Sequence, residues 1–125
     1  MRSLTPIGHL AAAATILTAL FVAAGSAAAD RPDTQLTFTR TDPDQPSRTV
    51  TLTCAPTGGN HPAAEAACAA LATADLTLPE ENQEVRCFRY YPVTLRAEGT
   101  LRGQQISIEK TYGCLVPELA DPWRF

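Results

Sequence analysis

Residues able to carry catalysis are few in this chain of 125 residues. Beyond the first thirty positions the only histidine is His61, and Pro62 follows it where a helix is expected to begin. The only serines there are Ser47, beside a proline in a turn, and Ser107, on the polar side of an expected strand. Nothing in this spacing brings a nucleophile, a base and an orienting acid together. We therefore expect no enzymatic activity, and we interpret His61 as a helix-cap or surface residue.

Carboxylates gather in the run Glu80-Glu81-Asn82-Gln83-Glu84. Two neighbouring carboxyl groups can act as acid and base when an apolar pocket raises the pKa of one of them. The residues around this run offer no such pocket in the sequence. We interpret the run as a solvated connection between elements.

A different chemistry is indicated by the segment Arg86-Cys87-Phe88-Arg89-Tyr90-Tyr91-Pro92. This segment of seven residues contains three aromatic residues and two arginines together with a cysteine and a proline, in a chain otherwise poor in aromatic residues. Aromatic and arginine side chains carry much of the energy of protein interfaces. The segment is either an exposed binding loop or a strand whose aromatics lie in the core and whose arginines face water. Composition alone does not decide between these two.

Four cysteines are present, Cys54, Cys68, Cys87 and Cys114. In an oxidising compartment an even number favours two disulfides, for which the sequence allows three pairings. We expect Cys54–Cys68, joining a strand end to a helix, and Cys87–Cys114, anchoring the 88–92 segment to the far end of a hairpin. Closing loops of this size is worth about 3 kcal/mol each. A zinc site is not expected because there is no C-x-x-C pair, and we predict no metal or other cofactor.

The first 29 residues have the layout of a secretory signal peptide. Met1-Arg2 carries a positive charge, an uncharged apolar run spans 10–24, and small residues lead to Ala29. This order is typical of a cleaved signal, and the apolar run is shorter than the roughly 20 residues that span a bilayer. We expect cleavage after Ala29, export to the extracellular medium, no membrane attachment afterwards, and one domain over residues 30–125.

The charge of that domain argues against a nucleic-acid partner. Loss of Arg2 with the signal takes the formal net charge from −3 to −4, and no basic cluster supplies the footprint that nucleic-acid binding needs. A domain of this size buries only a modest core. Small secreted domains usually compensate with disulfides.

Alternating polar and apolar residues predict the strands that must position the 86–92 segment. Leu36 and Phe38 alternate with threonines, and the stretches 49–54, 93–98 and 106–109 repeat this period of two. Arg102-Gly103 supplies the turn of a hairpin between the last two stretches.

A helix is expected from about Pro62, which suits the first helical position. Its core face would hold Ala64, Ala67, Cys68 and Leu71. The tail 115–125 is apolar and is expected to cover an edge or the end of the sheet. The predicted fold class is therefore α+β, with an antiparallel sheet of about five strands and one or two helices on one face.

Several stretches resemble the Streptomyces subtilisin inhibitor family. They are Val50-Thr-Leu-Thr-Cys-Ala-Pro56, Gly59-Asn-His-Pro-Ala-Ala64, Ala67-Cys68 with Leu71, Cys87 with Tyr91-Pro92-Val93, the hairpin with Gly103, the closing Cys114 and the terminal Phe125. The resemblance covers residues 36–125.

The resemblance implies a secreted inhibitor of trypsin-like or subtilisin-like serine proteases that acts by the substrate-like standard mechanism. It also implies a homodimer built on a five-stranded antiparallel sheet, with sequential disulfides. The family's primary specificity residue lies two positions after the third cysteine, which is Arg89 here, so the reactive bond would be Arg89–Tyr90. Phe88 and Tyr90 would flank the inserted side chain and Cys87 would clamp the loop. The remaining residues of the protease-binding set would be Arg86 and Tyr91.

Alternatives follow from the length of this loop, since the stretch between Cys87 and Pro92 is one residue shorter than the family pattern. A shifted register would make Tyr90 the inserted residue and a chymotrypsin-like protease the target. A disarmed loop would leave a non-inhibitory secreted binding module on the same scaffold. The family also makes a role as transglutaminase substrate conceivable, through Gln83, Gln104, Gln105 or Lys110.

Overall fold

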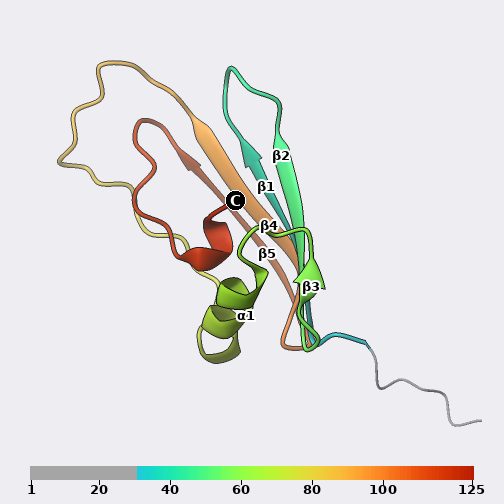
Figure 1. The fold of residues 1–125 in the computed structure, drawn as a ribbon. Coiled ribbons are helices and arrows are strands. Elements are labelled where there is room, and N and C mark those ends of the chain that lie inside the picture. The colour runs from blue at the N-terminus through green and yellow to red at the C-terminus, as the bar shows by residue number, and fades with distance from the viewer. Residues whose placement is uncertain (1–30) are drawn as a thin grey trace, which may run out of the picture.

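The computed structural model describes residues 31–125, so the expected signal peptide and its cleavage site lie outside the described residues. Five antiparallel strands form one sheet in the order β3-β2-β1-β4-β5. The predicted fold class is confirmed, with one α-helix and one short 3₁₀ helix accompanying the sheet (Figure 1). The elements are β1 (Thr34–Thr41), β2 (Arg48–Cys54), β3 (Gly58–Gly59), α1 (Ala64–Thr73), β4 (Val93–Leu101), β5 (Gln104–Tyr112) and η2 (Asp121–Trp123).

The sheet has one apolar face and one threonine-rich face. On the apolar face Phe38 of the central strand β1 lies opposite Val50 on one side and Ala97 on the other. On the other face the threonine hydroxyls bond across strands, Thr94 to Thr111 at 2.8 Å for example. The period of two in the sequence is therefore confirmed, because β-branched threonines favour strands while alternate residues enter the core. Buried on the apolar face are Leu36, Phe38, Leu52, Val93, Leu95, Ala97 and Leu101.

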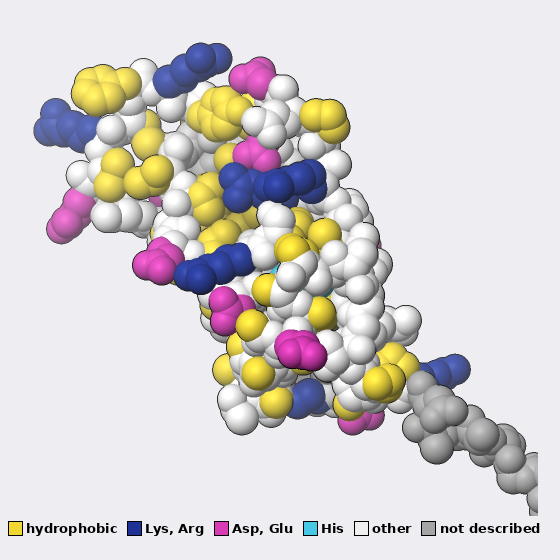
Figure 2. All heavy atoms as spheres, viewed as in Figure 1, with side chains coloured by type: hydrophobic (Ala, Val, Ile, Leu, Met, Phe, Trp, Pro, Cys, Tyr) yellow, Lys and Arg dark blue, Asp and Glu magenta, His cyan; other side chains and the backbone are white. Residues whose placement is uncertain are grey.

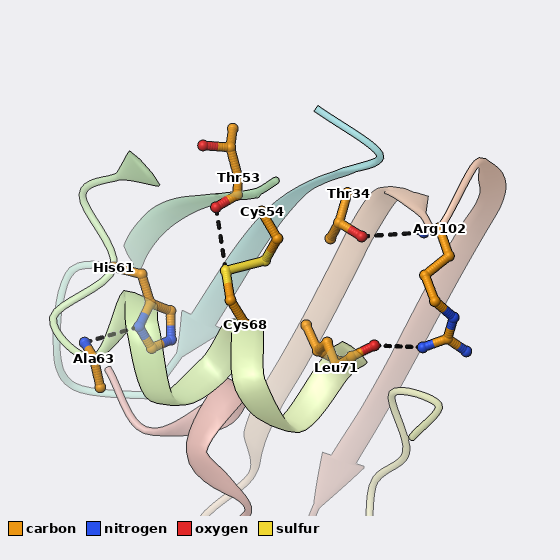
Figure 3. Close-up of a disulfide and its surroundings, with 8 residues drawn as sticks. All are labelled: Thr34, Thr53, Cys54, His61, Ala63, Cys68, Leu71 and Arg102. Carbon is orange, nitrogen blue, oxygen red and sulfur yellow. Dashed lines mark hydrogen bonds between the residues drawn. A yellow bond between two sulfur atoms is a disulfide. The ribbon is translucent and has the colours of Figure 1, made fainter. Parts of the chain in front are cut away.

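Helix α1 packs over the apolar face through Ala67 and Leu71. It begins at Ala64, two residues later than the expected start. Glu65 occupies the first turn, where a negative charge suits the helix dipole. The disulfide between Cys54 and Cys68 ties the end of β2 to the helix, with the two Cα atoms 5.6 Å apart (Figure 3).

The turn of the β4–β5 hairpin closes the C-terminal end of the helix. Arg102 has a φ of 45°, and its backbone N–H donates to the Oγ1 of Thr34 at 3.1 Å. Its guanidinium donates to the carbonyl oxygen of Leu71 (Figure 3). It also donates to the carbonyl oxygen of Ala74 and, at 2.6 Å, to the carboxylate of Asp75. A cation is favourable there because the last carbonyls of a helix carry partial negative charge.

The C-terminal tail lies on the same face as α1, so the prediction that it covers an edge or the end of the sheet was wrong. Trp123 is buried, its ring meeting that of Phe38 edge-on at 5.2 Å between centroids. Its indole N–H donates to the carbonyl of Thr77 at 3.0 Å. An alanine-rich helix of ten residues covers little apolar area, and the indole fills the space left over the sheet.

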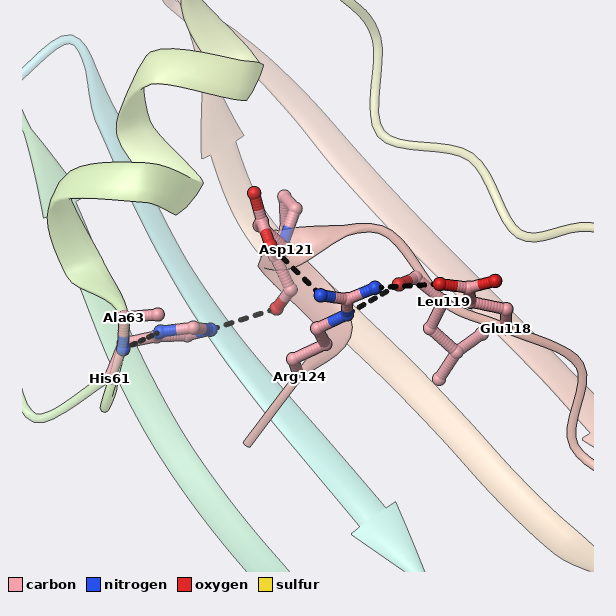
Figure 4. Close-up of polar contacts among 7 residues, drawn as sticks. His61, Ala63, Glu118, Leu119, Asp121 and Arg124 are labelled. Atoms are coloured by element: carbon pink, nitrogen blue, oxygen red, sulfur yellow. Dashed lines mark hydrogen bonds and ion pairs between the residues drawn. The ribbon is translucent and has the colours of Figure 1, made fainter.

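His61 is buried rather than at the surface, being 5% exposed. Its Nδ1 accepts the backbone N–H of Ala63 at 3.0 Å, so the expected cap at the helix start is present. Its Nε2 lies 2.9 Å from the carbonyl oxygen of Pro122 and donates to it (Figure 4). The surface interpretation failed because the tail, sixty residues later in the chain, covers the ring.

Both predicted disulfides are present, and no cysteine among residues 31–125 is free. Within the same range no group of three or more His, Cys, Asp or Glu side chains is placed to hold a metal ion. No helix formed by the described residues is long and apolar enough to cross a membrane.

Replacing His61 with phenylalanine keeps an aromatic ring in the core but leaves the Ala63 N–H and the Pro122 carbonyl without partners. We expect this substitution to lower the free energy of unfolding by about 2 kcal/mol. Urea unfolding with both disulfides intact measures the change. Glu118→Gln, which removes only an exposed ion pair with Arg124, serves as the control and should change stability by less than about 0.5 kcal/mol. Equal midpoints for the His61 variant and the wild type would contradict this account.

Candidate functional site

The connection between α1 and β4 carries the predicted binding segment to one end of the sheet (Figure 1). Every residue from 82 to 90 is exposed. Phe88 is fully exposed at 105% and Tyr90 is 73% exposed. The interpretation of this segment as a strand with core aromatics was therefore wrong, and we call residues 86–91 the exposed loop.

The exposed loop presents apolar and basic side chains side by side. Arg86, Phe88, Arg89 and Tyr90 are exposed, while Tyr91 is half-buried where the loop returns to the sheet. Figure 2 shows hydrophobic and basic side chains gathered at the projecting end of the molecule. Exposed aromatic residues beside arginines have the composition of the centre of a protein interface.

The exposed loop is anchored to the end of β5 at both of its ends. Cys87 is bonded to Cys114, with Cα atoms 5.6 Å apart. On the other side the backbone N–H of Tyr91 donates to the carbonyl oxygen of Gly113 at 2.8 Å. The two anchor points, Gly113 and Cys114, are consecutive residues.

The preceding strap, residues 79–81, lies against the same end of β5. Tyr112 donates its hydroxyl hydrogen to the carbonyl of Pro79 at 2.7 Å. Glu80 pairs with the ammonium of Lys110 at 2.7 Å, and Glu81 accepts the backbone N–H of Gly113 at 2.9 Å. Because Glu81 is half-buried and bonded, the prediction of a wholly solvated acidic run was wrong at this residue.

Tyr112 is the residue of this region whose ionisation is altered by its surroundings. Burial of the ring raises the pKa of its hydroxyl above the ordinary value, and the negative charges of Glu80 and Glu81 add to the effect. A neutral hydroxyl is thus retained as a donor to the strap.

Sequence reasoning brought out the loop and its disulfide but missed Gly113 and Glu81. The ring of Tyr90 lies against Gly113 so closely that a Cβ there would stand 2.8 Å from the Cε2 of Tyr90. The available signal was the glycine immediately before Cys114. The contact itself joins positions more than twenty residues apart and has no local signature.

Residues 32–114 match the family model described as subtilisin inhibitor-like. The chain belongs to the subtilisin inhibitor-like family. The resemblance to the Streptomyces subtilisin inhibitor family, found in the sequence, is therefore confirmed.

Relatives in this family come from Streptomyces. Subtilisin inhibitor-like protein 5 of Streptomyces fradiae is 45% identical over 83 residues, covering 62% of this chain and 78% of the relative. Subtilisin inhibitor-like protein 4 of Streptomyces lavendulae is 47% identical over 72 residues, covering 54% and 62%. The subtilisin inhibitor of Streptomyces albogriseolus is 44% identical over 71 residues, covering 54% of this chain and 49% of that protein. These relatives are named as inhibitors and not as enzymes.

A solved structure is similar as well. Sermetstatin of Streptomyces caespitosus, crystallised in complex with Bacillus licheniformis subtilisin, superposes with a TM-score of 0.50 at 30% sequence identity. The match covers 63% of this chain and 82% of sermetstatin.

The raised pKa of Tyr112 generates a prediction about alkaline stability. The folded-state pKa of this hydroxyl exceeds its unfolded value of about 10. Its hydrogen bond therefore contributes fully to the free energy of unfolding below about pH 10. The contribution is lost as the pH rises through the folded-state pKa, because the tyrosinate cannot donate to Pro79. We expect the wild type to be more stable than Tyr112→Phe by about 1 kcal/mol at about pH 8, and this advantage to shrink above about pH 10. Urea unfolding of both proteins across this range measures it, and a difference independent of pH would contradict the assignment.

Proposed function

We propose that this chain is a secreted inhibitor of subtilisin-like and trypsin-like serine proteases that binds them as a substrate would, with Arg89–Tyr90 as its reactive bond. The observation that carries the proposal is the exposed loop, whose two ends are fixed to consecutive residues at the end of β5. Family membership supports the class of activity. Export by the signal peptide would bring the inhibitor into contact with extracellular proteases.

The anchoring of the loop favours tight binding. A segment held in one conformation before binding loses little entropy when it enters a protease cleft, so more of the contact energy appears as affinity. Protease–inhibitor interfaces of ordinary size are among the tightest known. An exposed, pinned loop that offers aromatic and arginine side chains fits this pattern.

Arg89 is favoured over Tyr90 as the inserted residue. Arg89 is exposed and takes part in none of the ion pairs among residues 31–125. The Tyr90 ring lies on Gly113, and insertion of Tyr90 would require this contact to break. An arginine suits a protease pocket with a buried carboxylate, where the guanidinium can form two parallel hydrogen bonds.

The homodimer implied by the family is retained as part of the proposal. The mass of the protein in solution, measured by light scattering, distinguishes a dimer from a single copy.

Titration of trypsin and subtilisin with the purified protein tests the proposed function. We expect stoichiometric loss of both activities, because the loop is presented ready to bind. Arg89→Ala should weaken trypsin inhibition by about 100-fold or more, the effect of removing one partner of a buried charge pair. Arg89→Lys should retain most of it. Arg31→Ala, which removes an exposed arginine ahead of β1, at the other end of the sheet, is the matched control and should inhibit as the wild type does.

Two results would contradict parts of this proposal. Inhibition of chymotrypsin that is lost in Tyr90→Ala and kept in Arg89→Ala would place Tyr90 in the pocket. Failure to slow any of the three proteases with both disulfides intact would overturn the inhibitor assignment and favour the non-inhibitory binding module.

A further inference from the structure

We propose that Gly113 and Glu81 form a latch that keeps the Tyr90 side of the reactive bond in place after cleavage, an inference that rests on the proposed function. The latch would return the cleaved chain to the intact inhibitor instead of releasing it. Its parts are the ring of Tyr90, the backbone of Gly113 and the carboxylate of Glu81.

The two halves of a cleaved loop would remain tied to neighbouring points. The half ending at Arg89 is held covalently, because Cys87 is bonded to Cys114. The half beginning at Tyr90 has no covalent link to β5 close to the cut. From Val93 onward this half belongs to β4, where Val93 pairs with Tyr112. Next to the cut it is held by the Tyr91 N–H, which donates to the Gly113 carbonyl at 2.8 Å, and by the contact between the Tyr90 ring and Gly113. The position of the new amine at Tyr90 therefore depends on Gly113.

Gly113 allows a close approach that no other residue would permit. A Cβ at this position would lie 2.8 Å from the Cε2 and 3.2 Å from the Cδ2 of Tyr90. A distance below 3.0 Å forces the ring to move, since carbon atoms at rest stay about 3.5 Å or more apart. The ring can come this close to the backbone only because residue 113 has no side chain.

Glu81 holds Gly113 from the other side. Its Oε1 accepts the Gly113 N–H at 2.9 Å, so the N–H and the carbonyl of this one residue bond to the strap and to the loop respectively. Glu81 is half-buried, whereas residues 82 to 90 are all exposed. A hydrogen bond to a charged acceptor is stronger than one between neutral groups. The bond from Gly113 to Glu81 therefore fixes the backbone on which the Tyr90 ring rests.

The chemistry explains why such a hold matters. When the protease serine oxygen bonds to the Arg89 carbonyl carbon, the Arg89–Tyr90 bond breaks, and the Tyr90 nitrogen leaves as an amine carrying a proton from the protease histidine. The reverse step needs that amine to attack the Arg89 ester and return the proton. Water competes by hydrolysing the ester. An amine held beside the ester reacts at a high effective concentration, so the latch favours resealing over hydrolysis.

The test compares Glu81→Ala and Gly113→Ala with Glu80→Ala during long incubation with trypsin. Glu80 is the matched control because its carboxylate pairs with Lys110 and makes no hydrogen bond to Gly113. We expect all variants to inhibit stoichiometrically at the start. With Glu81→Ala, protease activity should then return at least about tenfold faster, as expected for loss of one hydrogen bond to a charged group. Gly113→Ala keeps that hydrogen bond but displaces the Tyr90 ring, so activity should return faster with this variant as well. Mass spectrometry should show accumulation of chain cut after Arg89.

Glu81→Gln retains an acceptor oxygen and should restore much of the persistence of inhibition. Thermal unfolding of each variant separates the latch from general stability, since a merely structural role would lower the midpoint without selective cutting at Arg89.

The outcomes separate the latch from the function on which it rests. Lasting inhibition by Glu81→Ala and Gly113→Ala, equal to that of the wild type, would overturn the latch and leave the inhibitor assignment standing. Slower association of these variants, with no faster cutting, would also overturn it, because the contacts would then shape the intact loop only. A wild type that never inhibits would overturn the proposed function and the latch together.

Discussion

The structure depends on the contact between Phe38, in the middle strand of the sheet, and the aromatic residues of the tail. Trp123 meets the Phe38 ring edge-on at 5.2 Å and Phe125 lies 5.8 Å from it. Helix α1 is too short and too rich in alanine to cover the sheet alone, so the tail completes the second layer over the core. An edge-to-face pair adds about 1 kcal/mol to the burial of its rings. The hydrogen bonds of His61 and Trp123 then fix the tail to segments that lie far away in sequence.

A covered sheet gives β5 a fixed end, and that end is the platform for the exposed loop. The strap and the loop together contribute few residues to the core, so their order cannot come from burial. It comes from the disulfide to Cys114 and from hydrogen bonds to Tyr112 and Gly113. Because the disulfide and the hydrogen bonds hold the loop, Phe88 can remain exposed, although burying a phenylalanine would stabilise the fold by about 1.5–3 kcal/mol. The proposed function accounts for this exposure, because a loop that enters a protease cleft has to keep such side chains free.

What the sequence predicts well here is local. Strands were recognised because threonines and apolar residues alternate within a few positions, as in β1 and β2. The helix was recognised from the spacing of Ala64, Ala67 and Leu71, with its start misplaced by two residues. The disulfide pairing was predicted from the position of each cysteine relative to the predicted strands, helix and hairpin. The positions of His61 and of the tail were predicted wrongly. The imidazole ring of His61 is buried by the tail that contains Pro122, and no sequence pattern near His61 indicates this contact. Glu81 was predicted to be solvated for the same reason. Its hydrogen-bond partner, Gly113, follows the β4–β5 hairpin and lies far from Glu81 in the sequence.

The same reasoning bears on the short exposed loop. Only four residues separate Cys87 from Pro92, and the support that receives them begins directly after β5 ends at Tyr112. So short a loop keeps Tyr90 beside the end of β5, where a Cβ at position 113 would stand 2.8 Å from its ring. A glycine at that position avoids the collision and supplies a carbonyl for Tyr91. The short loop and the glycine are therefore sterically matched, and Phe88 and Arg89 stay exposed.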